Sequence, residues 1–161
     1  MKNTLLFAGT LLLAGVAQAQ QPAAASQPAA TAAPPAATTA ALPRTAAPAS
    51  AELYFIAPAD GATVEKEFTV RFGLKGMGVA PAGITLDKTG HHHLLIDVTE
   101  LPPMNQPLPN DATHKHFGGG QTETTITLPP GKHTLQLILG DALHIPFDPP
   151  ILSKKITVTV K

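Results

Sequence analysis

The sequence predicts an all-β fold for residues 51–161, and three observations agree on it. Apolar and polar residues alternate with a period of two in several segments, which is typical of half-buried strands. Glycine and proline separate these segments, and no segment shows an apolar stripe of helical period. Several short strands within 111 residues favour an antiparallel β-sandwich, immunoglobulin-like in outline. A small closed barrel is the alternative.

The strands can be followed along the chain. Residues 53–64 read as a strand that runs into a Pro-Ala-Asp-Gly turn, and residues 67–75 alternate along their whole length. Residues 124–139 read as a hairpin around Pro129-Pro130-Gly131, because proline fixes φ and glycine permits the reversal. Residues 154–161 form the last strand. The predicted core positions of the three later strands are Phe68, Val70, Phe72 and Leu74; His133, Leu135, Leu137 and Leu139; and Ile156, Val158 and Val160.

Residues 1–19 have the pattern of a secretory signal peptide. A basic Lys2 precedes the apolar stretch 5–16, and Ala17-Gln18-Ala19 supplies the small residues that a signal peptidase reads. We expect cleavage after Ala19 and a periplasmic or secreted protein, without stable membrane insertion after cleavage. The chain has no cysteine, so neither a lipoprotein anchor nor a disulfide is possible.

Residues 20–50 differ in composition from the rest. They contain 14 alanines and 6 prolines, and the only large aliphatic residue among them is Leu42. Such a segment cannot bury enough apolar surface to offset the entropy of ordering it. It is predicted to be a disordered Ala/Pro-rich linker, either a spacer or a tail with no task. Without residues 1–19 the chain carries 10 basic and 11 acidic side chains, which argues against nucleic acid as a partner.

All seven histidines lie between positions 91 and 144, in the predicted β domain. In the stretch "HHHLLIDV", alternation puts His92 on the core face with Leu94, and His91 and His93 on the other face. His133 falls on a core face by the same argument. A buried neutral imidazole needs hydrogen-bond partners, so a structural role is favoured for His92 and His133.

The remaining histidines suggest a metal site. Two His-x-His pairs and a fifth histidine in a later loop could supply nitrogen ligands for copper, zinc or iron. We expect the two pairs to converge within about 5 Å, with carboxylates behind them. The alternative is a network of structural histidines that fixes loops to the sandwich. The candidate ligands are His91, His93, His114, His116 and His144, and the candidate carboxylates are Asp97, Asp111 and Asp141.

A glycine run follows the second histidine pair. Glycines allow close approach of the backbone, so the run is a candidate binding loop for a peptide, a glycan or an envelope protein. The alternative is a wide loop or bulge. It lacks the lysine and the helix of a phosphate loop. The residues of this candidate loop are Gly118, Gly119, Gly120 and Gln121.

The motifs "GHHHLLID", "HFGGGQTET", "LPPGKHTLQLILGD" and "HIPFDPP" together resemble the bacterial exported family known as domain of unknown function 4399. The resemblance covers residues 52–161 and implies a small histidine-rich exported domain with no established activity. Family members often carry a second histidine where this chain has Phe147, and this departure weakens the expectation of a complete metal site.

Two functions therefore follow from the sequence. The first is an exported domain that binds a transition metal through clustered histidines. The second is a non-catalytic module that binds an envelope partner, with structural histidines. No cysteine nucleophile and no serine in a nucleophile-elbow context is present, so catalysis would have to rely on histidine and a metal and is the least favoured interpretation.

Overall fold

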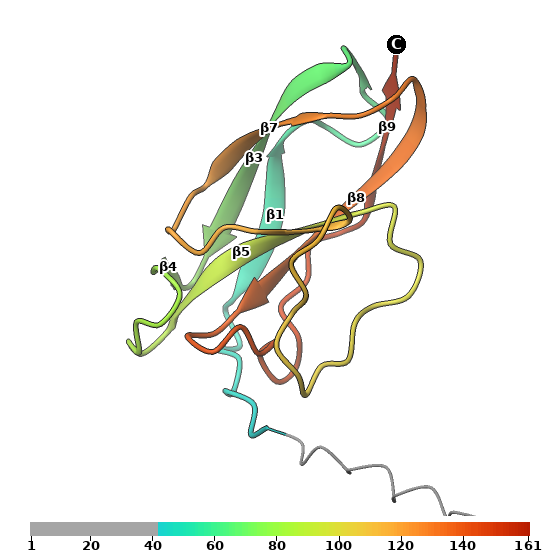
Figure 1. Cartoon of the computed structure of the whole chain (residues 1–161). Helices are drawn as coiled ribbons and strands as arrows, with labels where there is room; N and C mark the ends of the chain where they lie inside the picture. Colours follow the sequence, from blue (N-terminus) through green and yellow to red (C-terminus); the bar gives the residue numbers. More distant parts are fainter. Residues whose placement is uncertain (1–41) are drawn as a thin grey trace, which may run out of the picture. The chain divides into compact units, whose positions relative to one another are not determined.

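The computed structural model describes residues 42–161, and the predicted signal peptide and residues 20–41 lie outside the described residues (Figure 1). Within the described range the chain forms nine strands and no helix, so no helix there is suited to crossing a membrane. The strands are β1 (Glu52–Ala57), β2 (Thr63–Val64), β3 (Glu67–Lys75), β4 (Gly78–Val79), β5 (Thr89–Ile96), β6 (His114–His116), β7 (Glu123–Thr127), β8 (Gly131–Gly140) and β9 (Ile156–Val160).

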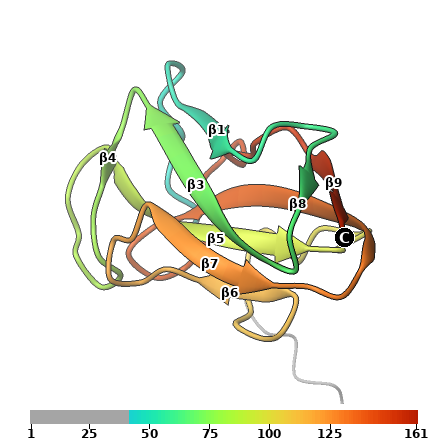
Figure 2. The same cartoon turned by 90° about the horizontal axis from the view of Figure 1, so that it is seen from above.

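The strands form two sheets that pack as the layers of a sandwich (Figure 1 and Figure 2). One sheet has the order β1-β3-β7, and the other has the order β2-β9-β8-β5-β4 with β6 also paired to β5. All pairs are antiparallel except the two-residue pairs β2–β9 and β4–β5. An immunoglobulin sandwich likewise consists of two packed antiparallel sheets. The predicted all-β, immunoglobulin-like fold is confirmed.

The hydrophobic core lies between the two sheets. Val70 and Phe72 of β3 pack with Leu94 of β5 and Leu137 of β8, and each of the four is at most 2% exposed. The aliphatic and aromatic positions predicted for the core faces of β3, β8 and β9 are buried or half-buried. Burial at about 25 cal/mol per Å² of apolar surface is the main stabilising contribution in a chain without disulfides.

The predicted hairpin over residues 124–139 is wrong, although both of its strands exist. β7 pairs with β3 in one sheet, whereas β8 pairs with β5 and β9 in the other. Pro129 and Pro130 have no N–H donor, so the β7 ladder cannot continue through them. Gly131, at φ 139°, then redirects the chain across the sandwich. The turn residues correctly predicted that the chain reverses here. The reversal connects a strand of one sheet to a strand of the other sheet, and not two adjacent strands of the same sheet.

Strand β5 is buried on both faces. His92, Leu94 and Ile96 face the core between the sheets, and the predicted alternation is confirmed there. The opposite face carries His91, His93 and Leu95 on the outside of the second sheet. The long connection from β5 to β6, drawn in yellow in Figure 1, covers this outer face, and its Leu108 packs on Leu95. The loops therefore enclose polar side chains outside the sandwich core.

The last residues of the predicted linker pack against the domain. The backbone N–H of Ala47 donates to the carbonyl of Asp148 at 2.8 Å, and the N–H of Asp148 donates to the carbonyl of Thr45 at 2.8 Å. Arg44 adds side-chain bonds to the same segment. The contacts come from backbone groups, from the side chains of Arg44 and Thr45, and from Ala47, which packs against the core. The Ala/Pro-rich composition of residues 42–50 gave no sign of them.

Candidate metal centre

Strand register brings three of the predicted ligands together. His91 and His93 stand two residues apart on the outer face of β5, and β6 pairs with β5 so that His116 lies opposite His93. One ring nitrogen from each of the three lies within 4.8 Å of the others. The Nε2 atoms of His91 and His93 are 3.0 Å apart. His91 and His93 are each 1% exposed, and His116 is half-buried.

His144 approaches the same three rings from the loop after β8. Its ring centroid lies 5.0 Å from that of His91, 4.7 Å from that of His116 and 6.1 Å from that of His93. The backbone of His144 has φ 67°, the left-handed region that histidine adopts more readily than most residues. A tight turn fixes this conformation, since the His144 N–H donates to the Asp141 carbonyl at 2.9 Å. We call these four residues the histidine cluster.

Burial keeps three rings of the cluster neutral, those of His91, His93 and His116. Burial lowers the pKa of His91 to about 4, and the rings of His144 and His116 add to this effect. Burial also lowers the pKa of His93 to about 2, with His91 and His116 as the next causes. Burial, followed by His144, lowers the pKa of His116. Near neutral pH the rings therefore retain the lone pairs that a metal ion requires.

Several ring nitrogens of the cluster lack hydrogen-bond partners in the part of the chain that the structure describes. Among the described residues, no hydrogen-bond partner reaches Nδ1 of His91, Nδ1 of His93 or Nε2 of His116, although all three atoms are buried. Buried polar atoms in proteins are nearly always paired, because an unpaired one loses its bond to water without replacement. A network of structural histidines would be expected to pair these atoms with backbone or carboxylate groups, and this one does not.

Two glycines leave room for the rings. A Cβ at Gly118 would overlap the imidazole of His116, and a Cβ at Gly140 would lie 3.1 Å from Nε2 of His93. Gly140 is also the register partner of His91. A methyl group at Gly118 would require the His116 ring to shift, and one at Gly140 would require the His93 ring to yield by a few tenths of an ångström. The glycines thus define the space that the cluster occupies.

The comparisons with known proteins complement this geometry. The sequence model of a family described as a domain of unknown function, DUF4399, matches residues 70–161. This chain belongs to the DUF4399 family. The matched range contains β5, β6 and the loop after β8, and so the whole histidine cluster. No curated protein matches the chain.

Two solved structures resemble the DUF4399 chain weakly. One is the endo-β-1,4-mannanase from Thermotoga petrophila, at 16% identity and a TM-score of 0.39, over 69% of this chain and 20% of the mannanase chain. The other contains fibronectin(III)-like modules of CbhA from Clostridium thermocellum, at 13% identity and a TM-score of 0.28, over 67% of this chain and 92% of that one. This chain thus spans about a fifth of the mannanase.

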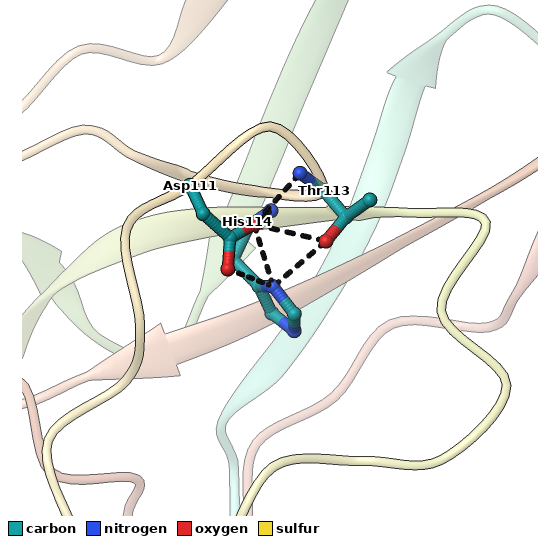
Figure 3. A network of polar contacts seen from close by, with 3 residues as sticks. All are labelled: Asp111, Thr113 and His114. Atoms are coloured by element: carbon teal, nitrogen blue, oxygen red, sulfur yellow. Dashed lines mark hydrogen bonds and ion pairs between the residues drawn. The ribbon is translucent and has the colours of Figure 1, made fainter.

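The structure does not bring His114 into the cluster of the DUF4399 domain. His116 lies directly opposite His93 on β5, whereas His114 lies opposite Leu95, two residues further along the strand. Its Nδ1 instead lies 3.0 Å from a carboxylate oxygen of Asp111, and the Thr113 hydroxyl donates to that same oxygen at 2.9 Å (Figure 3). The expected convergence of the two His-x-His pairs therefore holds for only one member of the second pair.

The predicted carboxylates are occupied elsewhere. Asp97 accepts hydrogen bonds from Nδ1 of His133 at 2.7 Å and from the N–H of Thr134 at 2.8 Å, so it fastens β8 and does not back a cluster histidine. Its carboxylate raises the pKa of His133. His133 also bonds the Pro129 carbonyl through Nε2 at 2.9 Å, which gives this ring the partners of a structural histidine. Asp141 lies near the cluster, but its Oδ1 accepts from the turn that carries His144, and its Oδ2 accepts from the Thr45 hydroxyl.

The glycine run has inward contacts. The N–H of Ala82 donates to the Gly118 carbonyl at 2.8 Å, and the side chain of Gln121 accepts from the N–H of Gly119 at 2.9 Å. Phe117 is buried in the sandwich core. The glycine run therefore lies beside His116, with Gly118 next to its ring, and Gln121 bonds back to Gly119 within the run. The run comprises Gly118, Gly119, Gly120 and Gln121.

Two further positions are clarified by the fold. Phe147, the position at which the resemblance implies a second histidine, is 2% exposed in the sandwich core and is not a member of the histidine cluster. Gly140 was not identified from the sequence, although a glycine that ends a run of buried strand residues signals a close approach. Arg44 and Thr45 were also missed, because they lie in a segment whose composition indicates disorder.

Proposed function

We propose that this DUF4399 domain binds one transition-metal ion through His91, His93 and His116. The observation that carries the proposal is the convergence of three imidazoles, two buried and one half-buried, with ring nitrogens within 4.8 Å of one another and no partner on Nε2 of His116 among the described residues. Imidazole nitrogen is a preferred ligand of zinc and copper. Binding an ion would replace the hydrogen bond between Nε2 of His91 and Nε2 of His93 and give Nε2 of His116 a bonding partner.

The distances suit a small divalent ion. Two nitrogens bound tetrahedrally at about 2.0–2.1 Å from zinc stand roughly 3.3 Å apart, and the Nε2 atoms of His91 and His93 are 3.0 Å apart. All three ring nitrogens lie within 4.8 Å of one another, so His116 needs to move inward by at most roughly 1.5 Å to reach the same spacing. His116 stands on a three-residue strand and is half-buried, so it is the ligand with most freedom to move.

The types of ligand atom present restrict the choice of metal ion. Iron in proteins commonly combines histidines with a carboxylate, and Asp141, the carboxylate that acts on the charge of His91, is already bonded by Thr45, Leu143 and Ile145. An all-nitrogen set favours Zn²⁺ or Cu²⁺, with Cu²⁺ the tighter of the two. We propose a binding or handling module and no catalytic activity.

The test uses the full chain without an affinity tag, stripped of metal and titrated with Zn²⁺ and with Cu²⁺ by calorimetry, with elemental analysis of the product. We expect one ion per chain. His116→Ala removes a ligand and should weaken binding by more than the roughly 10–100-fold typical of outer-shell changes. His114→Ala is the matched control, because His114 lies on the same strand outside the cluster.

Circular dichroism establishes that both variants remain folded. A wild-type chain that takes up neither ion would overturn the proposal and favour histidines that only support loops. Equal losses in His116→Ala and His114→Ala would also contradict it, because the cluster would then not be the binding site.

We also propose that the protein is exported, because residues 1–19 carry the pattern of a signal peptide. Cell fractionation and N-terminal sequencing of the chain expressed in a bacterium test this. A periplasmic or secreted product that begins at Gln20 is expected. A cytoplasmic product that still begins at Met1 would contradict it.

A further inference from the structure

The N-terminal segment 44–47 crosses the loop that carries His144, and we call this segment the strap. Arg44 donates through Nε to the carbonyl of Pro146 at 3.1 Å and through Nη2 to the carbonyl of Phe147. Its Nη1 forms an ion pair with Asp148 at 3.0 Å. These bonds join the strap to the chain directly after His144.

The strap also bonds the residue that organises the turn before His144. The hydroxyl of Thr45 donates to Oδ2 of Asp141 at 2.8 Å. The other oxygen, Oδ1, accepts the backbone N–H groups of Leu143 at 2.9 Å and Ile145 at 3.0 Å, on either side of His144. Asp141 is 9% exposed, so these bonds have little competition from water.

The turn leaves His144 in a conformation that needs external support. A non-glycine residue at φ 67° is uncommon and is retained where surrounding bonds over-determine it. Here the bonds from Asp141 fix the turn, and the strap fixes both Asp141 and the chain beyond His144. The conformation brings the imidazole beside the three-histidine set, with its centroid 4.7 Å from that of His116 and 5.0 Å from that of His91.

We infer that His144 is the fourth ligand of the metal ion and that the strap, through Arg44 and Thr45, is the positioning element that holds it there. This inference rests on the proposed function. When Arg44 and Thr45 make their bonds to the His144 loop and to Asp141, the site has four nitrogen ligands. A released strap leaves three nitrogens and one exchangeable position, which is the difference between a closed and an open metal site. By thermodynamic linkage, a bound ion also fastens the strap more tightly.

Copper provides a direct count of the ligands. The full chain is loaded with one equivalent of Cu²⁺, and the nitrogen hyperfine splitting in its electron paramagnetic resonance spectrum reports how many imidazoles are bound. We expect four for the wild type and three for His144→Asn, a substitution that tolerates the left-handed backbone. The strap variant Arg44→Ala/Thr45→Val should likewise show three and bind copper about 10–100-fold more weakly.

A double-mutant cycle separates positioning from general weakening of the fold. In a chain that already carries His144→Asn, the strap variant should cause no further loss of copper affinity, because the ligand that it positions is gone. Glu65→Gln is the control, since it removes only an exposed ion pair with Lys161 beyond β2, the edge strand at the opposite side of the sheet from β5.

The outcomes distinguish this inference from the proposed function. A wild-type chain that binds no copper overturns both. Copper bound by three nitrogens, with a spectrum that His144→Asn does not alter, overturns only the role of His144. A strap variant that keeps four nitrogens and full affinity, or that weakens binding equally in both backgrounds, overturns the role of the strap.

Discussion

At the scale of single residues, three adjacent histidines have two different environments. His91 and His93 face the cluster, whereas His92 lies in the sandwich core, where its ring centroid is 5.2 Å from that of Phe72. His92 is 0% exposed, and neither of its ring nitrogens has a hydrogen-bond partner among the described residues. Burial lowers its pKa to about 4, while the backbone of Gln121 acts in the opposite direction without reaching hydrogen-bonding geometry.

His92 is therefore expected to cost stability. Replacing it by leucine removes two unpaired polar atoms and keeps an apolar side chain against Phe72, so His92→Leu should raise the free energy of unfolding by about 1–2 kcal/mol. Urea denaturation at pH 7.5 measures this, and copper binding should stay unchanged. A loss of stability would show that the backbone of Gln121 satisfies the ring in solution.

Gly118 is the residue that makes space for His116. Gly118→Ala places a methyl group against the His116 ring and should weaken metal binding by about tenfold or more through displacement of that ligand. Gly119→Ala is the matched control, because its added methyl meets only the flexible end of the Gln121 side chain. Calorimetric titration with Zn²⁺ compares the two. Equal affinities would show that the loop yields and that the glycine has no part in placing the ring.

At the scale of strands, the sequence alone was enough to divide β5 correctly but not to choose its partners. A period of two assigns each histidine to a face, and this is a local property of the chain. Whether His114 or His116 meets His93 depends on the register of β6 against β5, which the distant loops determine. For the same reason the pattern of residues 124–139 predicted two strands but placed them wrongly in one sheet.

The hydrogen bond between Asp97 and His133 joins the end of β5 to the start of β8. Its contribution to stability can be tested by mutation. The pKa of His133 is raised by its hydrogen bond with Asp97. Its contribution to stability is thus fully present below the unfolded pKa of about 6.5 and is lost as pH rises through the higher folded pKa. Asp97→Asn should therefore destabilise the domain more at pH 5.5 than at pH 9, by less than about 1 kcal/mol because Asp97 is 45% exposed.

Urea denaturation at the two pH values measures this difference, and nuclear magnetic resonance titration of His133 should show its pKa falling toward 6.5. Asn is suitable because Asp97 has φ 56°, which asparagine tolerates. Asp87→Asn, at an exposed site, is the control. Equal destabilisation at both pH values would mean that the carboxylate matters as a backbone acceptor and not through the charged histidine.

At the scale of the whole molecule, burying three histidines makes the fold sensitive to acid. His91 and His92 have folded pKa values of about 4, and that of His93 is about 2, whereas all three titrate near 6.5 when unfolded. Between roughly pH 6.5 and pH 4 the unfolded chain therefore binds more protons than the folded one. Stability is complete above about pH 7 and falls as pH decreases through this window.

The expected slope is steep for so small a domain. Each proton taken up on unfolding contributes about 1.4 kcal/mol per pH unit, so three approach about 4 kcal/mol per unit, against a total stability of about 5–15 kcal/mol. We expect the metal-free chain, in the presence of a chelator, to unfold cooperatively between about pH 6 and pH 4. Urea denaturation over this range measures the slope, and His92→Leu should reduce it by about one third, because one of three protons is removed. A free energy of unfolding that stays constant from pH 7 to pH 4.5 would show that the rings reach water in solution, and it would remove the basis for a closed, dry site around the cluster.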